Sequence, residues 1–83
     1  MEIQLKLYGS SKILSEKEIL HVELPNNSNI EKLRYVLKKI ISKNYLKNNI
    51  ENLAKTAAFF SEADEIVNDS YKLKNKELIS IIP

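Results

Sequence analysis

The sequence predicts a two-layer α+β domain, in which one main helix covers one face of a mixed sheet of four to five strands. The start and the end of the chain both alternate apolar and polar residues, as strands with one buried face do. Between them lies a long stretch with apolar residues at helical spacing. A chain of 83 residues can form one core of this kind but not two, so we expect a single domain over residues 1–83.

The first two strands are expected to pair antiparallel. In the opening segment MEIQLKL, every second residue from Ile3 to Leu7 is apolar. Gly9, the only glycine of the chain, follows and favours a turn. The segment ILHVEL, residues 19–24, predicts the second strand. Pro25 ends it, because proline cannot donate a hydrogen bond to a sheet ladder.

The clearest helix is predicted over residues 28–44. Ser28 with Glu31 three positions later fits a capping box, in which each side chain binds the other residue's free backbone N–H. An apolar stripe at helical spacing follows, made of Ile30, Leu33, Leu37, Ile40 and Ile41, with Val36 at its edge. Asn44 is expected to end the helix. A further helical turn is expected within residues 45–54, with inward-facing Tyr45, Leu46, Ile50 and Leu53.

The rest of the chain predicts two or three more strands. The segment KTAAFFS, residues 55–61, is short, apolar and aromatic, which favours a central strand. EIVN, residues 65–68, predicts a short strand or bridge, and SYKL, residues 70–73, a tight turn that carries Leu73 into the core. ELISIIP, residues 77–83, predicts the last strand. If that strand pairs parallel with the first, it lies in the sheet centre, which is the β-grasp arrangement of ubiquitin and its relatives.

Composition narrows the range of functions. The absence of cysteine excludes disulfides, thiolate metal sites and a cysteine nucleophile. The alternating N-terminus is not a signal peptide and no apolar run is long enough to span a membrane, so we expect a cytoplasmic protein without a membrane partner. The net charge is only +2 and Arg34 is the single arginine, whereas nucleic-acid binders carry a stronger basic excess. Four clustered lysines therefore indicate a solvated helix face, and we expect no nucleic-acid partner: Lys38, Lys39, Lys43 and Lys47.

No arrangement of residues indicates catalysis or a bound metal or cofactor. His21 is the only histidine, and no nucleophile or second ligand can be placed beside it. A phosphate-binding glycine loop cannot form with one glycine. One acidic cluster matches no calcium loop and is typical of a solvated turn: Glu62, Asp64, Glu65 and Asp69. We therefore expect a protein that is not an enzyme by itself.

Several stretches, in order, are similar to one branch of the ubiquitin-like proteins. MEIQLKLYGS is similar to that branch's first strand, and ELP followed by NIEKLRYVL to its strand-end proline and helix. AAFF, EIVN and YKLKNKELISIIP are similar to its third strand, its small bridge and its last strand. The chain thus resembles, over nearly its whole length, the small subunit of molybdopterin synthase and the related thiamin sulfur carrier. It departs from them where Asn75-Lys76-Glu77 replaces a common Asp-Gly-Asp and where Phe59-Phe60 replaces Val-Asn.

The resemblance implies a sulfur carrier with two kinds of protein partner. In that family, an adenylylating enzyme related to ubiquitin activators acts on a terminal glycine carboxylate, which then becomes a thiocarboxylate. A larger synthase subunit receives the sulfur. The family continues beyond the position of Pro83 to Gly-Gly, which the printed sequence lacks. Three alternatives remain open: a longer native chain, a tail-less ubiquitin-like interaction module without carrier chemistry, and an unrelated β-grasp domain.

The resemblance also implies a partner-binding patch on the sheet. In the last strand, Ile79 and Ile81 point to one face and Ile82 to the other, because side chains alternate along a strand. Family members bind their partners through apolar residues on the face that the helix leaves open. By position, Phe60, Ile66 and Ile82 match that patch, and Pro83 lies at its end. Phe60 and Ile66 are equally compatible with a place in the core.

Overall fold

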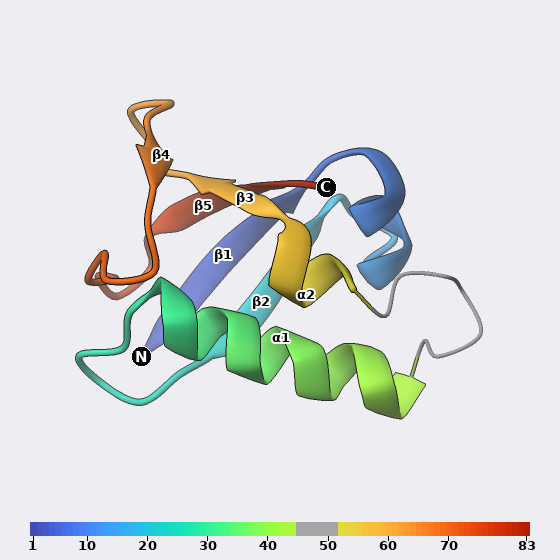
Figure 1. Ribbon diagram of the computed structural model, residues 1–83, viewed down its shortest axis with the longest axis horizontal. Coiled ribbons are helices and arrows are strands. Elements are labelled where there is room, and N and C mark those ends of the chain that lie inside the picture. Colours follow the sequence, from blue (N-terminus) through green and yellow to red (C-terminus); the bar gives the residue numbers. More distant parts are fainter. Residues whose placement is uncertain (45–51) are drawn as a thin grey trace.

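The computed structural model describes residues 1–44 and 52–83 and consists of two layers, a sheet and a long helix (Figure 1). The strands are β1 (Glu2–Leu7), β2 (Ile19–Glu23), β3 (Ala58–Phe60), β4 (Ile66–Val67) and β5 (Leu78–Ile82). The helices are the 3₁₀ helix η1 (Gly9–Leu14), the long α1 (Ile30–Asn44) and the short α2 (Leu53–Thr56). Within these ranges, none of the helices is long and apolar enough to cross a membrane.

The sheet confirms the predicted β-grasp topology. Its five strands lie in the order β2-β1-β5-β3-β4. The last strand, β5, pairs parallel with β1 and antiparallel with β3, so it occupies the centre of the sheet. β1 and β2 pair antiparallel, as expected. The chain ends where β5 leaves the sheet, at the end of the molecule that also holds η1 (Figure 1).

The core lies between α1 and the inner face of the sheet. The strands contribute every second side chain to the core, with outward polar residues between them in β1, and Phe59 of β3 is fully buried. Burial of each such side chain contributes about 1.5–3 kcal/mol. The largest buried side chains of the strands and of α1 are Ile3, Leu5, Leu7, Phe59, Ile79, Ile81, Ile30, Leu33, Leu37 and Ile41. Val36 and Ile40 are only partly buried, so they form the edges of the helical stripe.

The helix start differs from the predicted capping box. Asn29 is the capping residue: its Oδ1 accepts a hydrogen bond from the backbone N–H of Lys32 at 2.9 Å. The Ser28 hydroxyl instead donates to the carbonyl of Pro25 at 2.6 Å. The backbone N–H of Glu31 donates to a loop carbonyl after β4. Ser28 therefore closes the turn after Pro25, the helix begins one residue later than a Ser28 cap requires, and the prediction was wrong.

The segment predicted as a central strand, residues 55–61, also differs. Its first part belongs to α2, in which the N–H of Ala57 donates to the carbonyl of Leu53 at 3.0 Å. Only Ala58–Phe60 forms a strand, and it is an inner strand, paired with β5 on one side and with the two-residue edge strand β4 on the other. Leu53 and Leu73 are buried as expected. Three residues of the helical turn expected in 45–54 lie outside the described residues: Tyr45, Leu46 and Ile50.

The turn before β5 holds a residue in the left-handed region. Lys76 has φ +65°, and its backbone N–H donates to the carbonyl of Glu2. The Asn75 side chain accepts a hydrogen bond from the backbone N–H of Glu2 at 2.9 Å, which fastens the turn to β1. The Glu77 carboxylate accepts hydrogen bonds from the Tyr71 hydroxyl and from a backbone N–H of the turn. The bond to Glu77 raises the pKa of Tyr71 to about 12.

Lys76→Gly is expected to raise the free energy of unfolding by about 0.5–1 kcal/mol, because a Cβ atom disfavours a left-handed backbone and glycine removes it. Urea unfolding measures the change. The matched control is Lys74→Gly in the same turn. Lys74 does not have a positive φ, so that variant is expected to lose stability through added freedom of the unfolded chain. Equal losses in the two variants would contradict the role given to the Lys76 backbone.

Candidate protein-binding face

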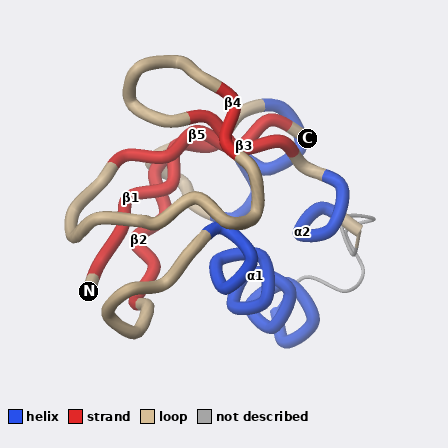
Figure 2. Tube along the Cα trace, turned by 60° about the vertical axis from the view of Figure 1, so that its left-hand side comes forward, coloured by secondary structure: helices blue, strands red, loops and turns tan. Residues whose placement is uncertain are grey.

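The face of the sheet that α1 leaves open carries a row of side chains across four strands. Phe60 of β3 lies opposite Ile66 of β4 on one side and Ser80 of β5 on the other. Ser80 in turn lies opposite Lys6 of β1. Since residues in register share a face, these four side chains point away from α1. β3, β4, β5 and the chain end gather at the end of the molecule away from α1 (Figure 2).

Four apolar and aromatic side chains of this face form what we call the sheet-face patch: Tyr8, Phe60, Ile66 and Ile82. Ile66 is 68% exposed, Ile82 38% and Tyr8 37%. Phe60 is half-buried, and with Tyr8, Ile82, Ser80 and Asp64 it lines an open hollow of about 230 Å³. Contiguous exposed apolar surface of this kind usually marks a site of protein interaction.

The structure brings together the residues singled out from the sequence. Ile82 points outward, as expected. Phe60 and Ile66, which were equally compatible with the core, both lie outside it, because Phe59 occupies the buried position of β3. Pro83 is exposed and follows Ile82 at the end of the sheet.

Sequence reasoning missed two contributors, Tyr8 and Asp64. The sequence did indicate the position of Tyr8, because Tyr8 continues the alternation in which Gln4 and Lys6 of β1 point outward. No comparable pattern indicated Asp64, which stands at the hollow because the turn after β3 folds back.

Local hydrogen bonds fix Tyr8 at the start of η1, and the end of the chain lies nearby. The Ser11 hydroxyl donates to the carbonyl of Tyr8 at 2.6 Å and accepts from its backbone N–H at 2.9 Å, which closes the first turn of η1. Gly9 follows with φ +56°, and a Cβ atom there would stand 3.5 Å from Cγ of Pro83. Gly9 thus permits the left-handed turn, and Pro83 lies beside it at ordinary contact distance. The end of β5 lies beside η1, next to the patch.

Charged groups stand at the rim of the patch. The Lys6 ammonium lies 5.4 Å from the centre of the Tyr8 ring. A hydrogen bond with Tyr8 raises the pKa of Lys6 above its ordinary value. Asp64 lies at the same hollow, so the apolar centre is bordered by a cation and an anion. A polar rim around an apolar centre is the ordinary composition of a protein interface.

The acidic cluster noted in the sequence disperses in the structure. The Glu62 carboxylate accepts a hydrogen bond from the backbone N–H of Leu78 at 2.8 Å, where β5 begins. Asp69 pairs with Arg34 at 2.8 Å. Residues 1–44 and 52–83 contain no group of three or more metal-ligating side chains close enough to hold an ion. His21 is exposed and pairs with the carboxylate of Glu2.

The fold is similar to that of a protein of known structure. No protein-family model matches the chain, and no curated protein matches it in sequence. Among solved structures, the crystal structure of SAMP1 from Haloferax volcanii is similar, with a TM-score of 0.69 and 8% sequence identity. The alignment covers 100% of this chain and 94% of that one. At this identity the likeness concerns the fold alone, and together with the strand order it shows that the chain has a ubiquitin-like β-grasp fold.

Proposed function

We propose that this protein is a ubiquitin-like sulfur carrier of the kind represented by the small subunit of molybdopterin synthase. The observation that supports the proposal most is the position of the sheet-face patch. Its apolar side chains adjoin Ile82 and Pro83, where β5 leaves the sheet. A partner that binds the patch therefore stands beside the chain end, which is the segment that a carrier presents.

The proposed chemistry takes place on partner proteins. The terminal carboxylate of the native chain attacks the α-phosphate of ATP and pyrophosphate leaves, which gives an acyl adenylate. Hydrosulfide from a sulfide donor then attacks the acyl carbon, AMP leaves with the bonding electrons of the acyl–oxygen bond, and loss of the proton gives a thiocarboxylate. The adenylylating enzyme supplies the first site and a larger synthase subunit receives the sulfur. The carrier contributes no catalytic group, only the docking surface and an anchored exit from the sheet.

The carrier step requires an arm beyond Pro83 that ends in Gly-Gly. An extended arm of about six residues reaches roughly 20 Å, enough to enter a partner's active site. Glycine suits such an arm, because it has no side chain to obstruct a narrow channel. β5 anchors the base of the arm, since it is paired on both sides in the sheet.

The proposal is tested by the intact mass of the natural full-length chain after incubation with ATP, an adenylylating enzyme and a sulfur donor. We expect an ATP-dependent gain equal to the replacement of one oxygen by one sulfur. A natural chain that stops at Pro83, or a mass that stays unchanged with an active enzyme, would overturn the carrier step. Continued binding to partners in that case would favour the tail-less interaction module.

Ile82→Asp is expected to weaken binding to the adenylylating enzyme at least about tenfold, because a carboxylate replaces an apolar side chain at the centre of the contact. Titration calorimetry measures the affinity. Unfolding stability should change little, since Ile82 is already 38% exposed. The control is Ile82→Leu, which keeps the apolar surface and should bind within a few-fold of the parent. Loss of the fold, or unchanged affinity, would contradict the assignment of Ile82 to the patch.

A further inference from the structure

The charges of the protein are divided between its two layers. The helices α1 and α2 carry six basic side chains and a single acidic one, Glu31. The rest of the described chain carries six basic and nine acidic side chains. The net charge of the whole chain is therefore only +2, although the helix layer by itself is strongly basic. The basic residues of this layer are Lys32, Arg34, Lys38, Lys39, Lys43 and Lys55.

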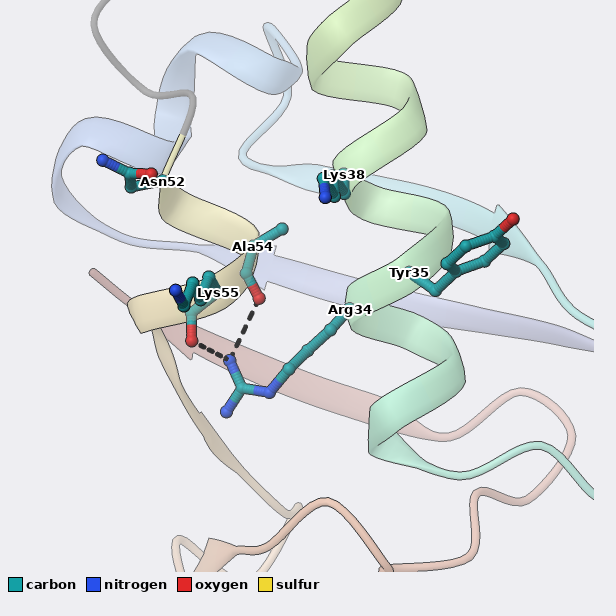
Figure 3. Close-up of a pocket in the computed structure, with 6 residues that line it drawn as sticks. All are labelled: Arg34, Tyr35, Lys38, Asn52, Ala54 and Lys55. Carbon is teal, nitrogen blue, oxygen red and sulfur yellow. Dashed lines mark hydrogen bonds between the residues drawn. The ribbon is translucent and has the colours of Figure 1, made fainter.

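A hollow of about 410 Å³ opens between α1 and α2, on the basic layer (Figure 3). Lys38 of α1 and Lys55 of α2 flank it from opposite sides, and Asn52 stands at the start of α2. Arg34 joins the two walls, because its Nη1 donates to the carbonyls of Ala54 and Lys55 at 3.1 and 3.3 Å. The volume lies in the range of small-ligand sites. The residues that line it are Arg34, Tyr35, Lys38, Asn52, Ala54 and Lys55.

The two flanking lysines are available for a ligand. Within residues 1–44 and 52–83, neither the Lys38 nor the Lys55 ammonium forms an ion pair. Among residues 1–44 and 52–83, no carboxylate lines the hollow. Arg34, in contrast, is engaged by Asp69 and by backbone carbonyls, so it shapes the wall. Two cations across a concave surface, with no acidic partner in the described part of the chain, attract an anion with more than one charge.

We propose that this hollow binds a small oligophosphate anion, with the ammonium groups of Lys38 and Lys55 and the Asn52 side-chain amide donating to phosphate oxygens. Lysine is a common phosphate ligand as a compact point charge. An anion with several phosphate groups carries more than one negative charge, so different phosphate groups can interact with the two lysines. The concave shape favours a small ligand over a nucleic-acid strand. Neither lysine belongs to the sheet-face patch, so this site and the proposed carrier function can fail independently.

Titration of the full chain with inorganic triphosphate at low salt tests the site, followed by calorimetry and by amide NMR shifts. The wild type is expected to bind with saturation, with shifts concentrated at residues 34–38 and 52–56. The double variant Lys38→Gln/Lys55→Gln should bind at least about tenfold more weakly, because two charge-assisted hydrogen bonds are lost. The control Lys17→Gln/Lys74→Gln removes the same charge from exposed positions outside the helices and should stay within about twofold.

Three results would overturn the proposal. Equal weakening in both double variants would show that net charge alone attracts the anion. A lack of saturable binding at millimolar triphosphate would show that the hollow holds no such ligand. Tighter binding of a single-stranded RNA, lost in the Lys38→Gln/Lys55→Gln variant, would show that the surface serves a nucleic acid instead.

Discussion

Phe59→Ala is expected to lower the free energy of unfolding by about 3–5 kcal/mol, the ordinary cost of emptying a large buried aromatic site. The Phe59 side chain is fully buried and lies in register with Ile81 of β5. The guanidinium of Arg34 also lies 4.7 Å from the centre of its ring. The substitution therefore removes core contacts and a cation–π contact together. Urea unfolding monitored by circular dichroism measures the loss.

Phe60→Ala is the matched control, because it makes the same chemical change one residue later on the opposite face of β3. Phe60 is half-buried at the sheet-face patch. We expect a loss of stability under about 1.5 kcal/mol, in keeping with partial burial, and a clear loss of partner affinity. Similar stability losses at the two positions would place Phe60 in the core and contradict its assignment to the patch.

The first and last strands of the chain, β1 and β5, allowed much of the fold to be predicted from the sequence. Along β1 and β5 every inward residue is aliphatic, and in β1 the outward positions before Tyr8 are polar, so the period of two is unambiguous in β1. A parallel pairing of these strands requires a crossover, and the long amphipathic helix provides it. The outward direction of Ile82 follows from alternation along the strand, whereas the central place of β5 depends on its parallel pairing with β1.

In the middle of the chain, alternation does not predict which side chains point inward. In KTAAFFS, two identical aromatic residues are adjacent, so alternation cannot decide which of Phe59 and Phe60 points inward. The pairing of Phe59 with Ile81 decides it, and that pairing is a long-range contact. The helix cap shows the same limit, since Ser28 and Asn29 are both good capping residues. Their roles depend on how the turn after Pro25 closes.

The short helix α2 is a further element that local sequence patterns do not predict, because its formation depends on contacts with Arg34. Four residues rarely form a helix unless tertiary contacts hold them. Here Arg34, twenty residues earlier, donates through Nη1 to the carbonyls of Ala54 at 3.1 Å and Ala57 at 2.7 Å. These bonds satisfy carbonyls that the end of a helix leaves free. The sequence shows Arg34 as one polar residue of a helix, and only the packing of α2 on α1 reveals its partners.

Arg34→Met is accordingly expected to lower the free energy of unfolding by about 2–4 kcal/mol, because hydrogen bonds to charged groups contribute about 1.5–3 kcal/mol and the carbonyls of α2 lose their partner. Methionine keeps the packing of the aliphatic part of the side chain, so the loss of stability measures the contribution of the guanidinium group. Chemical unfolding measures its size. Hydrogen exchange of the amides in residues 54–57 should become faster than in the parent, since α2 is released first.

Two controls separate the parts of this effect. Asp69→Asn removes the ion pair alone and should cost under about 1 kcal/mol, because the Asp69 side chain is 55% exposed. Arg34→Lys keeps the charge but not the planar fork, so the lysine cannot contact Asp69, three backbone carbonyls and the Phe59 ring together. We expect it to recover less than half of the loss. If Arg34→Lys were as stable as the parent, charge alone would explain the contact, and the position of α2 would need another cause.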